Sequence, residues 1–155
     1  ILEFFPYGHE KFSTLVSEFR QRIFEEVATS ELPGMIFTYV WALDQSDDKK
    51  QIDIYTEIFK RHGAEVYYVE LEADLEERLE RNKGEFRLAK KSSKRDISRS
   101  EKNLLQTEKT YQMNSDDDFF YHENYMKINN TNLLPDEVAK EIASAFGFTD
   151  NTGVA

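Results

Sequence analysis

The sequence predicts an α/β fold with three layers, in which helices cover both faces of a mostly parallel sheet. Segments with helical periodicity alternate with short apolar runs after a leading helix, which is the order that parallel strands and crossover helices require. The 155 residues are 39% hydrophobic and 14% aromatic, enough for the core of one domain. The chain has no cysteine, which excludes disulfides and thiolate chemistry.

Two elements dominate the first part of the chain. From about His9 to Ser30, apolar residues recur every three or four positions and form one wide stripe, which predicts a helix ended by Leu32-Pro33-Gly34. The run from Met35 to Leu43 (MIFTYVWAL) is continuous, aromatic and β-branched. Because it does not alternate with polar residues, it predicts a strand that is buried on both faces.

The later elements follow from the same patterns and from turn and capping residues. Asp47 or Asp48 begins a helix that runs to about His62, and Gly63 ends it. We expect a strand at Glu65–Leu71, a charged helix at Leu75–Asn82, a helix at about Ser98–Met113, a short strand at Tyr125–Ile128, and a last helix that begins at Pro135 and runs to about Phe146.

The charge of the protein is unevenly distributed. The formal net charge is -10, yet residues 83–102 hold eight basic and three acidic side chains, so this basic segment carries +5 and the remainder -15. Overall acidity argues against nucleic-acid binding, whereas a local basic segment suggests a small anionic partner. A solvated loop with charged helix ends is the alternative interpretation. With no apolar run long enough to span a bilayer, we expect a cytoplasmic protein without membrane contact.

Four pieces of the sequence, taken in order, carry a family resemblance. They are the leading helix with residues 35–44, the strand 65–71 with the helix DLEERLER at 74–81, the basic segment ending Lys94-Arg95-Asp96, and YMKINNT at 125–131 followed by LPDEVAKEI at 134–142. Together they resemble the P-loop small-molecule kinases of the shikimate, gluconate and nucleoside-monophosphate kinase group, especially bacterial shikimate kinase-like ATPases. The resemblance implies one kinase-like domain over residues 1–148, a lid at 83–97 and a disordered tail at 149–155.

The resemblance also implies a binding site for ATP and Mg²⁺ and an acceptor pocket for a small metabolite. It places Arg78 and Arg81 against the adenine or the phosphates, and the turn with Asn130 and Thr131 at the adenine ring. Each of these residues also has a purely structural interpretation. Arg78 could form a helical ion pair with Asp74, and Arg81 could form one with Glu77 or Glu85. The turn with Asn130 and Thr131 could simply cap the last helix.

Three further residues receive roles from the resemblance. Arg87 and Arg95 would reach the transferring phosphoryl group from the lid, where positive charge stabilises phosphoryl transfer. For Arg95, an ordinary surface ion pair is the alternative. Asp44 ends the predicted strand 35–43, where a carboxylate could hold Mg²⁺ through water or simply cap the following loop.

One motif of the kinase family is missing from the sequence. Walker A, GxxxxGK[ST], needs glycines before Lys-Ser or Lys-Thr, but the six glycines of this chain are isolated and none has that spacing. We therefore expect the first strand-loop-helix unit of the fold to lie upstream of Ile1, with this chain alone inactive. The competing hypothesis is a non-catalytic nucleotide- or anion-binding module without a phosphate loop. The acceptor and the oligomeric state stay open.

Overall fold

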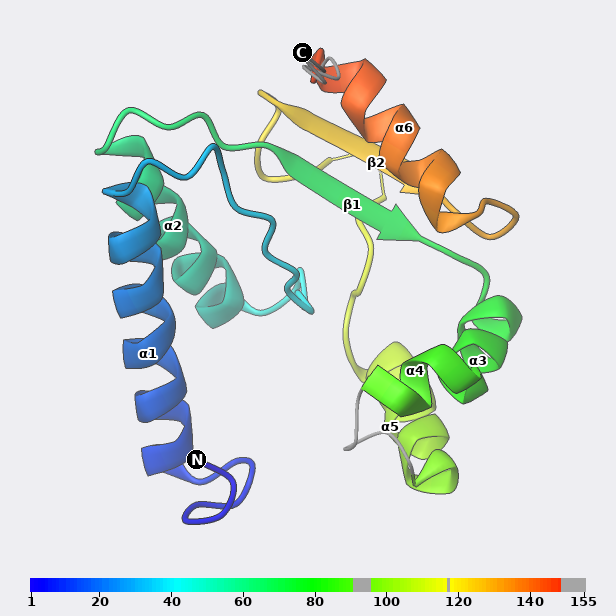
Figure 1. Cartoon of the computed structure of the whole chain (residues 1–155). Helices are drawn as coiled ribbons and strands as arrows, with labels where there is room; N and C mark the ends of the chain where they lie inside the picture. Colours follow the sequence, from blue (N-terminus) through cyan, green and yellow to red (C-terminus); the bar gives the residue numbers. More distant parts are fainter. Residues whose placement is uncertain (91–95, 117, 149–155) are drawn as a thin grey trace. The chain divides into compact units, whose positions relative to one another are not determined.

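The computed structural model describes residues 1–90, 96–116 and 118–148, which form six helices and two strands (Figure 1). The chain divides into two compact units. The first contains Ile1–Trp41 and Gln45–Val66, and the second contains Ala42–Asp44 and the chain from Tyr67 onward. Among the described helices, none has the length and apolar composition of a membrane span. The predicted tail at 149–155 lies outside the described residues.

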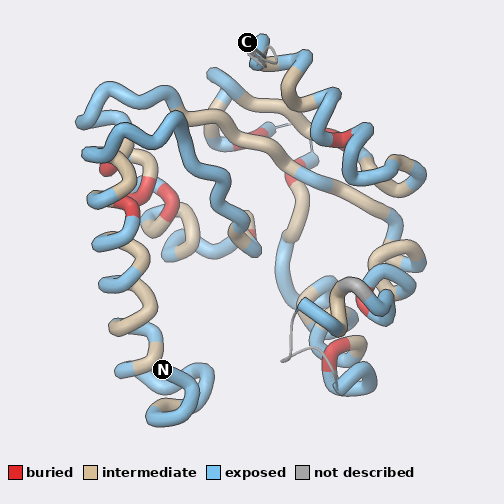
Figure 2. The backbone as a smooth tube through the Cα atoms, in the orientation of Figure 1, coloured by how far each residue is buried: buried red, intermediate tan, exposed pale blue. Residues whose placement is uncertain are grey.

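The first unit is built on two helices, α1 (Glu10–Ala28) and α2 (Ser46–Lys60), which pack against each other. Their buried residues meet around Phe24, which is only 2% exposed (Figure 2). The Phe24 ring contacts those of Phe37, Tyr55 and Phe59, with centroid distances of 4.9, 4.9 and 5.6 Å. The helical periodicity therefore predicted both helices to within two residues at each end.

The predicted strand at 35–43 is wrong. Residues 35–42 form neither helix nor strand, and Leu43 and Asp44 lie in a turn. The composition of this segment is typical of a buried strand, but a strand also needs a neighbour for its backbone hydrogen bonds. Within the described residues, no backbone–backbone hydrogen bond involves residues 35–40. The segment instead uses Phe37 to pack against the helices, and Ile36 and Val40 are exposed.

The second unit contains a parallel pair of strands, β1 (Tyr68–Glu72) and β2 (Tyr125–Asn129), as the sequence predicted. In their register, Tyr68 lies opposite Tyr125 and Glu70 opposite Lys127. The first strand begins three residues later than expected, and the sheet has two strands where three were predicted. The general α/β class is confirmed, and the three-layer arrangement stays a prediction.

Four helices accompany the strands in the second unit: α3 (Leu75–Lys83), α4 (Glu85–Lys90), α5 (Ile97–Thr110) and α6 (Pro135–Phe146). Pro135 occupies the first turn of α6, as predicted, and Gly147 ends the helix in the left-handed conformation with φ of 68°. Helix α3 contacts both α4 and α5, and α6 contacts β2. The sequence analysis expected a lid at 83–97 and missed α4, because six residues are too few to show helical periodicity.

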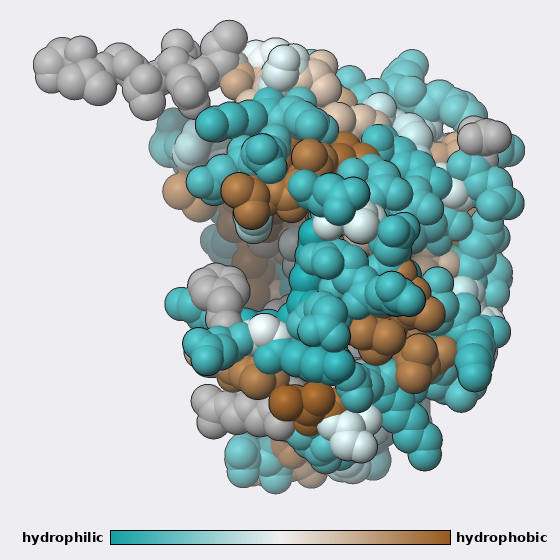
Figure 3. Space-filling view, turned by 90° about the vertical axis from the view of Figure 1, so that its right-hand side faces the viewer, coloured by the Kyte–Doolittle hydropathy of each residue, from teal (hydrophilic) through white to brown (hydrophobic). Residues whose placement is uncertain are grey.

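Hydrophilic side chains dominate the surface shown in Figure 3, and the apolar ones form separate patches among them. This distribution agrees with a composition in which 32% of residues are charged. The described residues of the second unit bury a small core, which includes Phe119, Ile128 and Val138.

Candidate functional site

The loops that follow β1 and β2 meet at the carboxyl ends of the two strands. The hydroxyl Oγ1 of Thr131 accepts a hydrogen bond of 2.9 Å from the backbone N–H of Asp74, which lies just before α3. The same hydroxyl donates to Oδ1 of Asn129 at 2.7 Å, and the Thr131 N–H donates to that oxygen at 3.1 Å. The backbone N–H of Asn130 donates to the Glu72 carbonyl at 2.8 Å. Open α/β sheets bind ligands at this edge, so this edge is the first candidate for a ligand-binding site.

Arg81 connects α3 to the same loop. Its Nη1 donates to Oδ1 of Asn130 at 2.9 Å, and its Nη2 donates to the carbonyls of Asn130 and Thr131 at 2.7 and 3.0 Å. Its Nε donates to Glu77 at 2.7 Å, which is one of the two helical ion pairs that the sequence analysis gave as the alternative role of Arg81. Four of the five N–H groups of the guanidinium are therefore used inside the protein. Arg81 holds the loop in place and has one N–H left for a ligand.

Arg78 and Arg87 are also engaged. Arg78 pairs with Glu108 of α5, and not with Asp74 as the helical spacing suggested. Arg87 of α4 donates from Nε to Oδ1 of Asn82 at 3.1 Å. The structure thus brings Arg81, Asn130 and Thr131 into direct contact, whereas the contacts of Arg78 and Arg87 are with other residues.

Asn82 joins α3, α4 and α5. Its side chain is almost completely buried, and Oδ1 accepts from Arg87 and, at 3.0 Å, from the Ser100 hydroxyl. Its Nδ2 has no hydrogen-bond partner among the described residues. Arg87 belongs to the segment 83–97 that the sequence analysis assigned to the lid, and Arg95 of that segment lies outside the described residues.

Asp44 lies in a turn and is hydrogen-bonded to a loop. Its Oδ1 accepts a hydrogen bond of 3.2 Å from the backbone N–H of Gln112, and the neighbouring Leu43 N–H donates to the Gln112 carbonyl at 2.7 Å. The alternative that Asp44 fixes a loop is therefore the one that the geometry favours. Among the described residues, no three His, Asp or Glu side chains are grouped so that they could hold a metal ion. One exposed carboxylate does not provide the ligands that Mg²⁺ requires.

The sequence analysis missed a polar cluster around Glu70 on β1. The side chain of Glu70 is only 9% exposed, and its carboxylate accepts four hydrogen bonds: from Asn114 Nδ2 and Ser115 N at 2.8 Å, and from the Ser115 and Tyr125 hydroxyls at 2.7 Å. Burial alone would raise the pKa of Glu70, but these hydrogen bonds together lower it below its usual value.

Lys127 completes the Glu70 cluster. Its ammonium lies 3.7 Å from Glu70 and 3.4 Å from Glu72, and it donates to the Ser115 carbonyl. A signal for this pair was present in the sequence, because Glu70 and Lys127 are charged residues within the two predicted strands. Their partners at 114 and 115 had no such signal, since they lie in a polar segment without periodicity.

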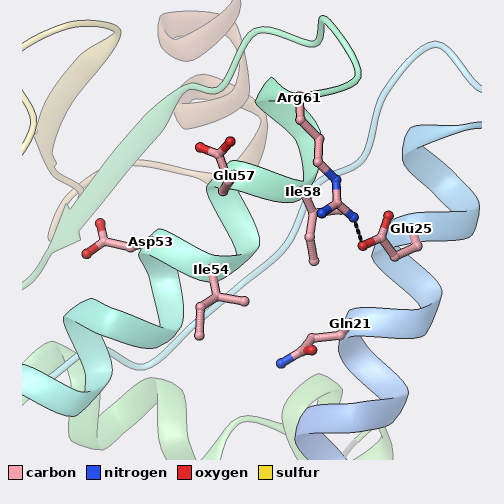
Figure 4. A pocket seen from close by; sticks show the side chains of 7 residues that line it. All are labelled: Gln21, Glu25, Asp53, Ile54, Glu57, Ile58 and Arg61. Carbon is pink, nitrogen blue, oxygen red and sulfur yellow. Dashed lines mark hydrogen bonds and ion pairs between the residues drawn. The ribbon is translucent and has the colours of Figure 1, made fainter.

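The first unit has an open cavity of about 490 Å³ between α1 and α2 (Figure 4). The carboxylates of Glu25, Asp53 and Glu57 line it together with Arg61, which pairs with Glu25 across the gap. Ile54 and Ile58 provide its apolar wall. Among the described residues, Glu25 pairs with Arg61 and Asp53 with Lys49, so two of the three carboxylates already have basic partners.

Comparisons with protein-family models, with curated proteins and with solved structures give no match for this chain.

Proposed function

We propose that this chain contributes the adenine-side residues of the nucleotide site in an ATP-dependent kinase that phosphorylates a small metabolite. The observation that carries the proposal is the contact between Arg81 and the Asn130–Thr131 loop at the carboxyl ends of two parallel strands. Arg81 is 49 and 50 positions away from Asn130 and Thr131 in the sequence, and the resemblance assigned Arg81 to the adenine or the phosphates and the loop to the adenine ring of one site.

In this proposal the loop, and not the guanidinium of Arg81, recognises the base. Arg81 uses most of its donors to hold the loop carbonyls, so its effect on ATP is to position Asn130 and Thr131. The Nδ2 amide of Asn130 is a donor that can reach a ring nitrogen of adenine. Arg78 and Arg87 lie on neighbouring helices, and each would exchange its present partner for a phosphate oxygen.

Among the described residues, no three His, Asp or Glu side chains are grouped to hold a metal ion, so we derive no step through a protein-bound metal. ATP carries Mg²⁺ on its own phosphates, and the ion would neutralise charge on the transferring group. The arginines would do the same from the protein side. Phosphoryl transfer also needs a phosphate-binding loop, which these 155 residues do not contain.

Calorimetric titration of the chain with ATP, adenosine and inorganic triphosphate tests the proposal. We expect ATP and adenosine to bind, and Asn130→Ala to weaken both by about five- to tenfold, since one good hydrogen bond contributes about 1 kcal/mol. Arg22→Ala is the matched control, because Arg22 is exposed and pairs only with Glu26 among the described residues. Absence of adenosine binding, or equal losses in both variants, would contradict the adenine-side assignment.

The same titration tests the anion-binding alternative. Triphosphate that binds as tightly as ATP, with no contribution from adenosine, would support it. The local ion pairs argue against that outcome, because Lys83 already lies 3.3 Å from Glu80 and 3.1 Å from Glu101. A conservative variant, Arg81→Lys, separates positioning from charge: lysine keeps the charge but cannot bridge two carbonyls, so we expect it to weaken adenosine binding as Arg81→Ala does.

A further inference from the structure

The segment Ile36–Val40 has the chemistry of a strand but no strand beside it. Its side chains alternate in exposure: Ile36 is 94% exposed and Val40 is 78% exposed, and Thr38 between them is exposed too. Phe37 is less exposed, at 37%, and its ring contacts that of Phe24, while the Tyr39 hydroxyl lies 3.2 Å from a carboxylate oxygen of Asp48. A period of two in exposure is the geometry of an extended strand with one face already packed.

The backbone of this segment is available for pairing. Within the described residues, none of the peptide groups of residues 36–40 takes part in a backbone–backbone hydrogen bond. A row of unpaired N–H and C=O groups on a β-branched and aromatic segment is a template for another strand. Since its Phe37 and Tyr39 side chains are held by the helices, the segment is already ordered for such a partner.

The sequence of the segment identifies the partner as a second copy. Ile-Phe-Thr-Tyr-Val reads the same in both directions by class: β-branched, aromatic, Thr, aromatic, β-branched. An antiparallel pair related by a two-fold axis at Thr38 sets Ile36 opposite Val40 of the second copy, and Phe37 opposite Tyr39. Such β-branched and aromatic cross-strand pairs are favourable, and Thr38 faces itself.

Charge permits this contact in a protein that otherwise repels itself. The formal net charge is -10, but residues 32–43 form the longest run without a charged side chain, 12 residues. Two copies that meet along this run place no like charges directly opposite each other. We infer that residues 36–40 pair with the same residues of a second copy as an antiparallel two-stranded ribbon, which makes a concentration-dependent homodimer.

A cysteine crosslink tests the register, because the chain has no cysteine of its own. In Thr38→Cys the two introduced thiols lie opposite each other, and we expect a disulfide-linked dimer under mild oxidation. In Ile36→Cys the two thiols lie four residues apart along the ribbon, roughly 13 Å, and no crosslink is expected. Equal crosslinking of both variants, or of neither, would overturn the proposed pairing.

Charge exchange tests the same contact without crosslinking. We expect two double variants, Ile36→Lys/Val40→Lys and Ile36→Glu/Val40→Glu, each to sediment as a monomer at concentrations where the natural chain forms dimers, because like charges then lie opposite each other. An equimolar mixture of the two variants should form a dimer again, because opposite charges then lie opposite each other. Both positions are exposed, so the substitutions leave the core intact. Phe19→Lys/Ile23→Lys is the control, because these α1 residues are 57% and 53% exposed and lie outside the ribbon.

The outcomes that overturn the inference are distinct from one another. A natural chain that stays monomeric at all attainable concentrations excludes self-pairing. A dimer that survives in both charged variants, or is lost in the Phe19→Lys/Ile23→Lys control alone, uses another surface. A chain that stays monomeric and instead binds a peptide with the sequence of residues 34–42 in parallel orientation has an open edge but no two-fold contact.

Discussion

Glu70→Gln provides the sharpest test of how the second unit is held together. The substitution keeps the shape of the side chain but removes the charge from a carboxylate that accepts four hydrogen bonds. Hydrogen bonds to a charged group contribute about 1.5–3 kcal/mol each and neutral ones about 0.5–1.5 kcal/mol. Since the Ser115 and Tyr125 hydroxyls can turn to accept from the new amide, we expect the lost charge to cost about 2–3 kcal/mol in the free energy of unfolding.

The pH dependence of this loss follows from the lowered pKa of Glu70. A carboxyl group whose pKa is lower in the folded state stabilises the fold at every pH above its unfolded value, and that stabilisation is lost as the pH falls through the folded value. The natural protein and Glu70→Gln should therefore differ fully at neutral pH. The difference should shrink once the pH falls below about 4.5, the ordinary value for Glu.

Chemical denaturation of both proteins at neutral and acidic pH measures this difference. Glu72→Gln is the control, because the Glu72 side chain lies on the same strand, is 40% exposed and, among the described residues, forms an ion pair with Lys127 alone; we expect it to cost less than about 1 kcal/mol. For a chain of this length, 2 kcal/mol corresponds to about 4–8 °C in Tm. Equal losses in the two variants, or a Glu70→Gln loss that is the same at pH 7 and at pH 3, would refute the reasoning.

Three further predictions concern other parts of the chain. Phe24→Ala should lower the free energy of unfolding by about 3–5 kcal/mol in chemical denaturation, because it leaves a cavity in the core between α1 and α2. Phe19→Ala, at an exposed position, should cost less than about 1 kcal/mol, and similar costs for the two variants would disprove the core assignment. Gly147→Ala should cost about 1 kcal/mol in the same assay, since φ of 68° strains any residue with a Cβ, and an unchanged stability would argue against this helix end. Burial and the Asp48 carboxylate raise the pKa of Tyr39 to about 12, and burial also raises the pKa of Tyr125. An ultraviolet titration should therefore show late-ionising tyrosines, one of which Tyr39→Phe removes; a variant with an unchanged curve would exclude this environment of Tyr39.

Five of the six described helices could be predicted from the sequence because their signal is local, whereas α4 was missed. Periodic apolar residues, Pro135 at the start of a helix and Gly147 at its end all act within one or two turns. The strand at 125–129 was predicted for the same reason, since its flanking turn residues bound it closely. The segment 35–43 had the strongest strand composition in the chain and yet is not a strand, because pairing depends on a partner that composition does not reveal.

The nucleotide site stays a prediction. The contact of Arg81 with Asn130 and Thr131 joins residues that the family resemblance had assigned to the nucleotide, Arg81 to the adenine or the phosphates and the loop to the adenine ring. The donors to Glu70 could not be predicted, since nothing local marks Asn114 or Ser115 as partners of a residue more than 40 positions away. Long-range hydrogen bonds of this kind depend on where a loop passes beside a strand. That position is set by the whole fold and not by any short segment of the sequence.

Charge counted along the sequence overstates the attraction that the basic segment 83–102 exerts on an anion. Among the described basic residues in and beside it, Lys83 pairs with two glutamates, Arg78 with Glu108 and Arg81 with Glu77. Each pair must open before its cation can bind a phosphate, and the separated carboxylate then lies near the bound anion and repels it. Hydrogen bonds from a fixed loop involve no such exchange. The carboxyl edge of β1 and β2 is therefore better suited to select a ligand by the shape and hydrogen-bonding pattern of a base than by negative charge alone.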